Sequence, residues 1–199
     1  MKTKTPIETK DYFLTQEPFS LVKIKGLDVY KTTPRIKKEA IGKYYKSTKY
    51  LSHNNNKSLF SILYRLVRRL NFYFKYKVLK TVSDSEKSLL DFGSGNAYFV
   101  SQLNKRGLPA VAYDPFYDSV LNKKINDDKV LKDEKSLISA KFNTVTMWHS
   151  LEHVFSYKDT LSLVSKTLMS KGNLIVACPN YKSFDANYYK KFWAGFDVP

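Results

Sequence analysis

The sequence predicts an α/β fold with a parallel sheet, preceded by a small N-terminal subdomain and a long connecting helix. From residue 88 onward, short apolar segments typical of buried strands alternate with helical segments. A glycine-rich turn joins the first strand to its helix. Strands separated by helices in this way form right-handed βαβ units. We therefore divide the chain into an N-terminal subdomain (1–57), a connecting helical region (58–87) and an α/β domain (88–199).

The composition excludes several classes of protein. At 43% hydrophobic and 15% aromatic residues, the 199-residue chain can bury a core, which argues against global disorder. No apolar run approaches the roughly 20 residues of a membrane-spanning helix, and the first residues lack the apolar stretch of a secretory signal. The single cysteine, Cys178, excludes a disulfide framework and a zinc site built from several thiolates. We expect a cytoplasmic protein without a membrane span.

The formal net charge of +16 is concentrated in the first half of the chain. Residues 1–88 contain 20 basic and 7 acidic side chains. Lysines outnumber arginines 29 to 5, whereas phosphate-binding surfaces favour the bidentate guanidinium group of arginine. We therefore expect a solvated lysine surface and no specific nucleic-acid partner, with weak contact to anionic surfaces as a by-product.

Residues 58–81 are predicted to form one long helix, with Ser58 as its cap. Apolar side chains recur on a single helical stripe made of Leu59, Ile62, Leu63, Leu66, Val67 and Leu70. Arg65, Arg68 and Arg69 fall largely off this stripe. We expect the stripe to pack on the domain core and the basic face to meet solvent. A basic amphipathic helix that lies on a membrane is the alternative.

Five strands are predicted in the α/β domain, at 89–92, 110–113, 129–131, 143–148 and 174–178. Helices are predicted over 98–106, 116–124 and 157–170. The carboxyl ends of parallel strands meet at one edge of the sheet, where such folds bind ligands. The residues that directly follow these strands are therefore candidates for a site.

The turn after the first strand is the most informative segment. It contains Asp91, Gly93, Ser94, Gly95, Asn96 and Ala97. Small residues let the backbone turn tightly and approach a ligand, and the following helix supplies unpaired N–H groups. A dinucleotide site needs a third glycine where Tyr98 stands, which argues against NAD or FAD. The spacing fits a second pattern instead, D-x-G-x-G-x-G/A.

This pattern resembles motif I of the class I S-adenosylmethionine-dependent methyltransferases. The resemblance implies a Rossmann-like sheet, S-adenosylmethionine as cofactor and methyl transfer to a small-molecule acceptor, with an oxygen or nitrogen nucleophile favoured over carbon. The glycine turn would hold the methionine part of the cofactor. Asp114, followed by Pro115, stands where an acid of the family meets the ribose hydroxyls. Asp133 or Glu134, after the third strand, is expected to reach the adenine amino group.

The segment after the fourth strand carries Trp148, His149, Glu152 and His153. His149 and His153 have the i, i+4 spacing of two metal ligands. However, a metalloprotease helix places its acid beside the first histidine, and no third ligand is evident. The segment resembles the region after strand four in small-molecule methyltransferases, including the quinone O-methyltransferase group. We take Trp148 and His149 as cofactor contacts. His149 is also the candidate general base, with shaping of the pocket as its equally weighted alternative.

The N-terminal segment resembles a zinc-binding unit found in a bacterial branch of these enzymes, but it departs from that pattern. Val22, Thr33-Pro34-Arg35, Tyr44-Tyr45 and Ser52-His53 stand at matching positions. Ile24 and Leu27 occupy the two thiolate positions, and no upstream pair of cysteines exists. We therefore expect no stoichiometric zinc, apolar packing in its place, and a need for the main domain as support.

The family's complete sheet has seven strands in the order 3-2-1-4-5-7-6, and we identify five. The last two strands are therefore expected to be missing, which leaves the strand at 174–178 as an open edge that invites self-association or a partner. We expect cofactor binding with weak or no turnover. The alternatives are a catalytically impaired cofactor-binding scaffold and a basic nucleic-acid-associated protein on the same fold.

Overall fold

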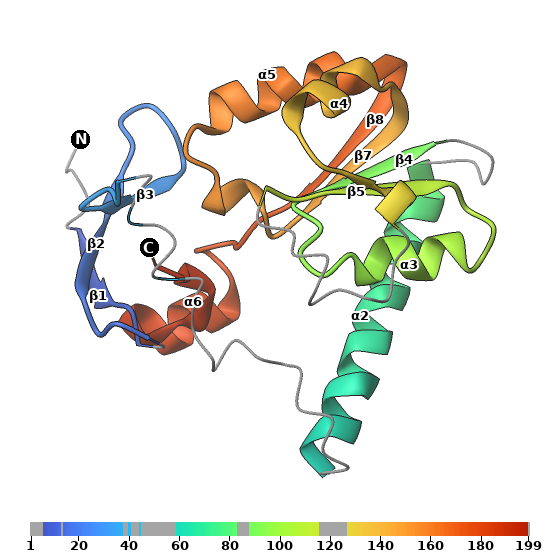
Figure 1. Ribbon diagram of the computed structural model, residues 1–199. Helices are drawn as coiled ribbons and strands as arrows, with labels where there is room; N and C mark the ends of the chain where they lie inside the picture. Colours follow the sequence, from blue (N-terminus) through green and yellow to red (C-terminus); the bar gives the residue numbers. More distant parts are fainter. Residues whose placement is uncertain are drawn as a thin grey trace. The chain divides into compact units, whose positions relative to one another are not determined.

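The computed structural model describes residues 6–12, 14–37, 40, 44, 59–82, 88–115 and 127–198 (Figure 1). The chain groups into two compact units, Met1–Asn55 with Pro179–Pro199, and Asn56–Cys178. This grouping differs from the boundaries expected from the sequence, since residues 179–198 join the N-terminal segment instead of the α/β domain. The predicted helix at 116–124, the cap at Ser58 and the Ser52-His53 pair lie outside the described residues.

The second unit contains a five-stranded parallel sheet. Its strands are β4 (Leu89–Phe92), β5 (Ala110–Tyr113), β6 (Val130–Leu131), β7 (Phe142–Trp148) and β8 (Leu168–Ala177). The spatial order is β6-β5-β4-β7-β8. In chain order this is 3-2-1-4-5, so the predicted Rossmann-like α/β fold is confirmed. Among the described residues, β8 is an edge strand.

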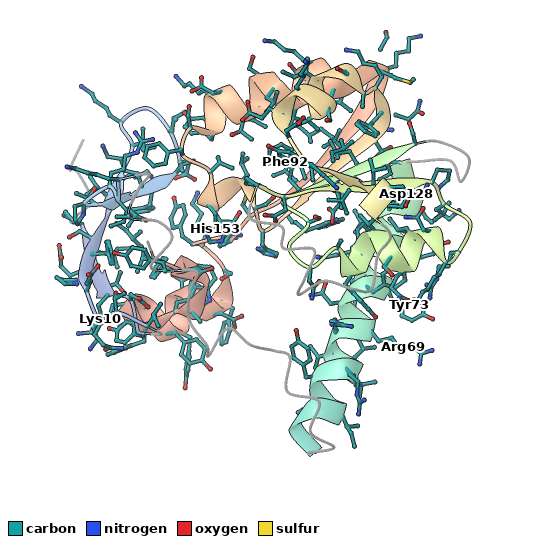
Figure 2. All side chains as sticks on the ribbon, in the orientation of Figure 1. Lys10, Arg69, Tyr73, Phe92, Asp128 and His153 are labelled. Atoms are coloured by element: carbon teal, nitrogen blue, oxygen red, sulfur yellow. The ribbon has the colours of Figure 1, made fainter. Side chains whose placement is uncertain are left out.

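Helices cover both faces of this sheet (Figure 1). On one face lie α2 (Leu59–Val82) and α3 (Tyr98–Asn104), and on the other lie α4 (Glu134–Ser139) and α5 (Tyr157–Thr167). Short 3₁₀ turns occupy Asp127–Lys129 (η3) and Leu151–His153 (η4). Because side chains alternate along a strand, Leu89 packs with α2 and α3, whereas Leu90 and Phe92 pack with α4 and α5. Phe92 is labelled in Figure 2.

Helix α2 has the predicted extent but buries a different face. Ile62, Leu63, Leu66, Val67 and Leu70 are 50–57% exposed, so the expectation that this stripe packs on the core is wrong. The buried residues are Phe72 and Leu79, which are 3% and 4% exposed and lie two turns apart. Bulky aromatic contacts determine the docking, since Phe72 packs against Phe99 of α3 with ring centres 5.7 Å apart. Within the described residues, no helix has the length and apolar character required to span a bilayer.

The first unit contains a three-stranded antiparallel sheet. Its strands are β1 (Ile7–Lys10), β2 (Pro18–Lys23) and β3 (Tyr30–Thr33), and its C-terminal part contains α6 (Phe184–Tyr189), η5 (Lys190–Phe192) and η6 (Ala194–Phe196). The buried core consists of Phe19, Leu21 and Val198. Val198 lies far from the other two in sequence, so the end of the described chain completes a core that the N-terminal strands begin.

Ile24 and Leu27, which occupy the expected thiolate positions of the zinc-binding unit that this segment resembles, lie in the turn between β2 and β3. The backbone N–H of Leu27 donates to the carbonyl of Ile24 at 3.1 Å, and that of Ile24 donates to the carbonyl of Val29 at 2.9 Å. Backbone hydrogen bonds therefore close this turn. Around it, Asp28 accepts hydrogen bonds from Lys23, Tyr181 and Lys182, which links the turn to the C-terminal segment of the same unit.

Candidate functional site

The glycine turn after β4 is held by the end of the neighbouring strand β5. The backbone N–H groups of Gly93 and Ser94 both donate to the carbonyl of Tyr113, at 2.8 and 3.2 Å. The N–H of Gly95 donates to Oδ2 of Asp114 at 2.7 Å. Two of the predicted site elements, the glycine turn and Asp114, are therefore in direct contact.

The two glycines have different steric requirements. Both adopt positive φ angles, +73° at Gly93 and +53° at Gly95, which glycine tolerates without strain. A Cβ atom on Gly93 would lie 2.3 Å from the Cβ of Ser150, whose hydroxyl donates to the carbonyl of Phe92. A Cβ on Gly95 would meet no atom within 4 Å. Gly93 therefore permits close packing inside the fold, whereas Gly95 faces open space.

Asp91 is buried on the face of the sheet that α2 covers. It pairs in register with Thr146 on β7, whose hydroxyl donates to Oδ1 of Asp91 at 2.6 Å. Burial raises the pKa of Asp91 to about 6, although the Thr146 hydroxyl and the charge of Lys75 both favour the ionised form. A carboxyl group in such an environment titrates close to neutral pH, which is common at functional sites.

A cavity lies between α2, the glycine turn and the start of α3. Its walls are formed by Tyr64, Arg68, Asn71, Phe72, Lys75, Asp91, Ser94, Asn96, Tyr98 and Phe99. Its volume is about 170 Å³, below the roughly 300 Å³ at which pockets begin to bury a whole drug-sized ligand. The cavity can therefore accept only part of a nucleoside-sized ligand.

Lys75 is a site residue that the sequence analysis missed. Its Nζ lies 5.7 Å from the ring centre of Phe99 and 5.4 Å from that of Trp148, within cation–π range. Burial lowers the pKa of Lys75, and the negative charge of Asp91 opposes that effect. A signal was present in the sequence, because the cavity-lining residues Tyr64, Arg68, Asn71 and Lys75 recur at the helical spacing of 4, 3 and 4 residues.

Among the described residues, two buried side-chain atoms have no hydrogen-bond partner, Oγ of Ser94 and Nε1 of Trp148. Leaving a buried polar atom unpaired costs about 1–3 kcal/mol. Ser94 lines the cavity, so a ligand atom there would satisfy its hydroxyl. Trp148 packs edge-on against Phe99 with ring centres 6.0 Å apart, next to the cavity wall.

His149 lies at the carboxyl edge of the sheet, as predicted, but is not among the residues that line this cavity. Its side chain is 61% exposed, and its Nδ1 lies 3.4 Å from Oε1 of Glu152. Its backbone has a φ angle of +53°, and its N–H donates to the carbonyl of Ala177 on β8 at 2.9 Å. The strained backbone fixes the start of the loop that follows β7.

Three other predicted site residues, Asp133, Pro115 and Ala97, are not among the residues that line the cavity. Asp133 is exposed and caps α4, since its Oδ1 accepts from both the backbone N–H and the hydroxyl of Ser136 at 2.7 Å. These hydrogen bonds lower the pKa of Asp133. Its cap explains the residue without a ligand, so an adenine contact stays a prediction. Pro115 is exposed directly after Asp114. Ala97 is buried with a φ angle of +52° and precedes α3.

Most of the chain matches a known protein family. A family model described as a methyltransferase domain matches residues 59–198. No curated protein matches the chain.

Among solved structures, a possible histamine N-methyltransferase from Thermotoga maritima shares 22% identity over 63% of this chain and 60% of its own, with a TM-score of 0.49. A SAM-dependent methyltransferase from Archaeoglobus fulgidus shares 18% identity over 63% of this chain and 61% of its own, with a TM-score of 0.48. The chain thus spans about 60% of the length of these two proteins.

Proposed function

The chain belongs to the methyltransferase-domain family, and from that membership we propose that it transfers a methyl group from S-adenosylmethionine to a small nucleophilic acceptor. One observation supports this proposal above the others. The carboxylate of Asp91, the ammonium group of Lys75 and the unpartnered hydroxyl of Ser94 surround one cavity at the glycine turn.

The chemical groups of the cavity suit the methionine end of this cofactor. That end carries an ammonium group and a carboxylate. Asp91 would accept hydrogen bonds from the ammonium group, and Lys75 and Arg68 would attract the carboxylate. Ser94 would gain the partner that its hydroxyl lacks. The limited volume of the cavity agrees with a site for this end of the cofactor alone.

The ribose end would lie on the other side of the glycine turn. Asp114 is anchored there by the N–H of Gly95, and a carboxylate can accept hydrogen bonds from two vicinal hydroxyls. The open space outside Gly95 gives the ribose room to approach. We assign Ala97 and Pro115 to the same part of the site, Asn96 to the methionine end because it lines the cavity, and Asp133 to the adenine as a prediction.

When bound, S-adenosylmethionine supplies a methyl carbon, activated by the positively charged sulfur that carries it, for in-line attack by a nucleophile. The protein's tasks are to align the two reactants and to exclude water. We assign the proton transfer to His149, whose exposed imidazole would take a proton from an O–H or N–H acceptor. Trp148, packed against Phe99, would close the wall between the cofactor and this histidine.

The test is transfer of a labelled methyl group from S-adenosylmethionine to small molecules of a cell extract. We expect label in a small-molecule fraction, and a large loss of it in Asp114→Ala at cofactor concentrations below saturation. Asp159→Ala, an exposed acid in the first turn of α5, is the matched control and should keep full transfer. Binding of S-adenosylhomocysteine without any transfer would overturn the enzymatic proposal and favour a cofactor-binding scaffold.

A further inference from the structure

We propose that the outer face of α2 docks on an anionic lipid bilayer. The outer face consists of Ile62, Leu63, Leu66, Val67, Leu70 and Phe74. These side chains are 50–71% exposed. This inference does not depend on methyl transfer, because it concerns a surface outside the cavity.

The geometry of the helix explains why the described residues of its own unit leave this face uncovered. At about 100° per residue, Leu63, Leu66 and Leu70 lie on the side of α2 opposite Phe72 and Leu79. Phe72 and Leu79 contact the sheet domain, so the leucines point away from it. Figure 1 shows the first half of α2 extending beyond the sheet and α3. Exposed apolar patches of this kind mark interaction sites.

The charges of the helix favour an anionic partner. None of the 24 residues of α2 is acidic, whereas six are basic, namely Arg65, Arg68, Arg69, Lys75, Lys77 and Lys80. Arg69 lies beside Ile62 at one edge of the apolar residues, and Lys77 lies two turns beyond Leu70 on the same side of the helix. Their long side chains suit contact with lipid headgroups while the leucines enter the acyl boundary. In Figure 2, Arg69 and Tyr73 lie one turn apart on the helix.

The same observations argue against two other partners. A second copy of the chain would bring two acid-free helices of a +16 protein together, and like charges would oppose that contact. A nucleic acid would need basic side chains at the centre of the surface, where this helix has leucines. An interfacial helix combines apolar burial with attraction to anionic lipids, and α2 carries both features.

The experiment is co-sedimentation of the full chain with vesicles of phosphatidylcholine and phosphatidylglycerol, compared with vesicles of phosphatidylcholine alone. We expect binding to the anionic vesicles that weakens with added salt. The variant Leu63→Gln, Leu66→Gln, Leu70→Gln should lower the partition coefficient by about tenfold or more, because it removes apolar area from the contact. Arg69→Gln with Lys77→Gln should lower it and flatten its dependence on salt.

The matched control is Ile138→Gln on α4, an equally apolar side chain that is 48% exposed outside this face and should bind as the wild type does. Circular dichroism and light scattering on each variant separate loss of binding from loss of folding or assembly. A wild type that stays in the supernatant overturns the proposal, as does a triple variant that binds equally well. A wild-type dimer that the triple variant makes monomeric would assign the face to a second copy and also overturn it.

Discussion

The hydroxyl of Thr146 donates a 2.6 Å hydrogen bond to the carboxylate of Asp91, between the paired strands β7 and β4. Both side chains are buried. The hydrogen bond favours the ionised carboxylate, yet burial outweighs it and raises the pKa of Asp91 to about 6. The fold thus keeps a poorly solvated acid next to the glycine turn, where the proposed cofactor contact would use its charge.

The raised pKa of Asp91 predicts a specific pH dependence of stability. Because the folded pKa exceeds the ordinary value of 3.8, the ionised carboxylate opposes folding above about pH 6, and this effect disappears below about pH 4. Asp91→Asn removes the titration. Its free energy of unfolding relative to the wild type should therefore rise by about 1–3 kcal/mol between pH 4 and pH 7.

Urea unfolding at both pH values measures this difference. Asp159→Asn, an exposed acid on α5, is the control and should show a much smaller change. A constant difference between Asp91→Asn and the wild type across this pH range would show that Asp91 titrates at its ordinary value in the folded protein.

The contact between Gly93 and Ser150 predicts coupled substitutions. Gly93→Ala should destabilise the protein by more than about 2 kcal/mol, because the new methyl group would overlap Ser150 in addition to the strain of its positive φ. Gly95→Ala should cost only about 1 kcal/mol, since it adds the strain alone. In a Ser150→Gly background, the cost of Gly93→Ala should fall by at least about 1 kcal/mol. Equal costs in both backgrounds, measured by urea unfolding, would contradict this packing.

The position of Val198 predicts that the C-terminal segment stabilises the N-terminal unit. Val198 is 8% exposed in a core with Phe19 and Leu21, so Val198→Ala should lower the stability of this unit by about 1–3 kcal/mol. The fluorescence of Trp193 in a Trp148→Phe background reports on the unit. Phe184→Ala, which truncates a side chain that is 80% exposed, should change the transition little. Matching transitions for the Val198 and Phe184 variants would rule out the packing role of Val198.

The parallel sheet and the glycine turn could be predicted because both are encoded locally, whereas the strand order followed from the resemblance to the methyltransferases. Short apolar runs between helical segments determine a parallel sheet, and its carboxyl edge follows from the topology. The spacing of Asp91, Gly93 and Gly95 indicates the turn without knowledge of distant contacts. The sequence implied that Gly95 and Asp114 lie near each other, because each follows one of two neighbouring strands. It did not predict the hydrogen bond between them.

The buried face of α2 could not be predicted from periodicity. The regular stripe that includes Leu63 and Leu66 is more apolar than the buried side. The docking of α2 nevertheless depends on the contact between Phe72 and Phe99 of α3, which the local sequence does not show. Such tertiary contacts override local pattern. The same holds for Val198, which packs with strands at the other end of the sequence, and for Lys75, whose role depends on the position of the whole helix.

Calorimetric titration with S-adenosylhomocysteine, with NAD titrated in parallel, tests the central claim most directly. We predict saturable binding of S-adenosylhomocysteine and none of NAD. Asp114→Ala should weaken the binding by about 1–3 kcal/mol, the cost of lost hydrogen bonds to a charged group. Asp159→Ala should bind as the wild type does. Equal affinity for NAD, or no heat with S-adenosylhomocysteine from folded protein, would contradict the assignment of the glycine turn to this cofactor.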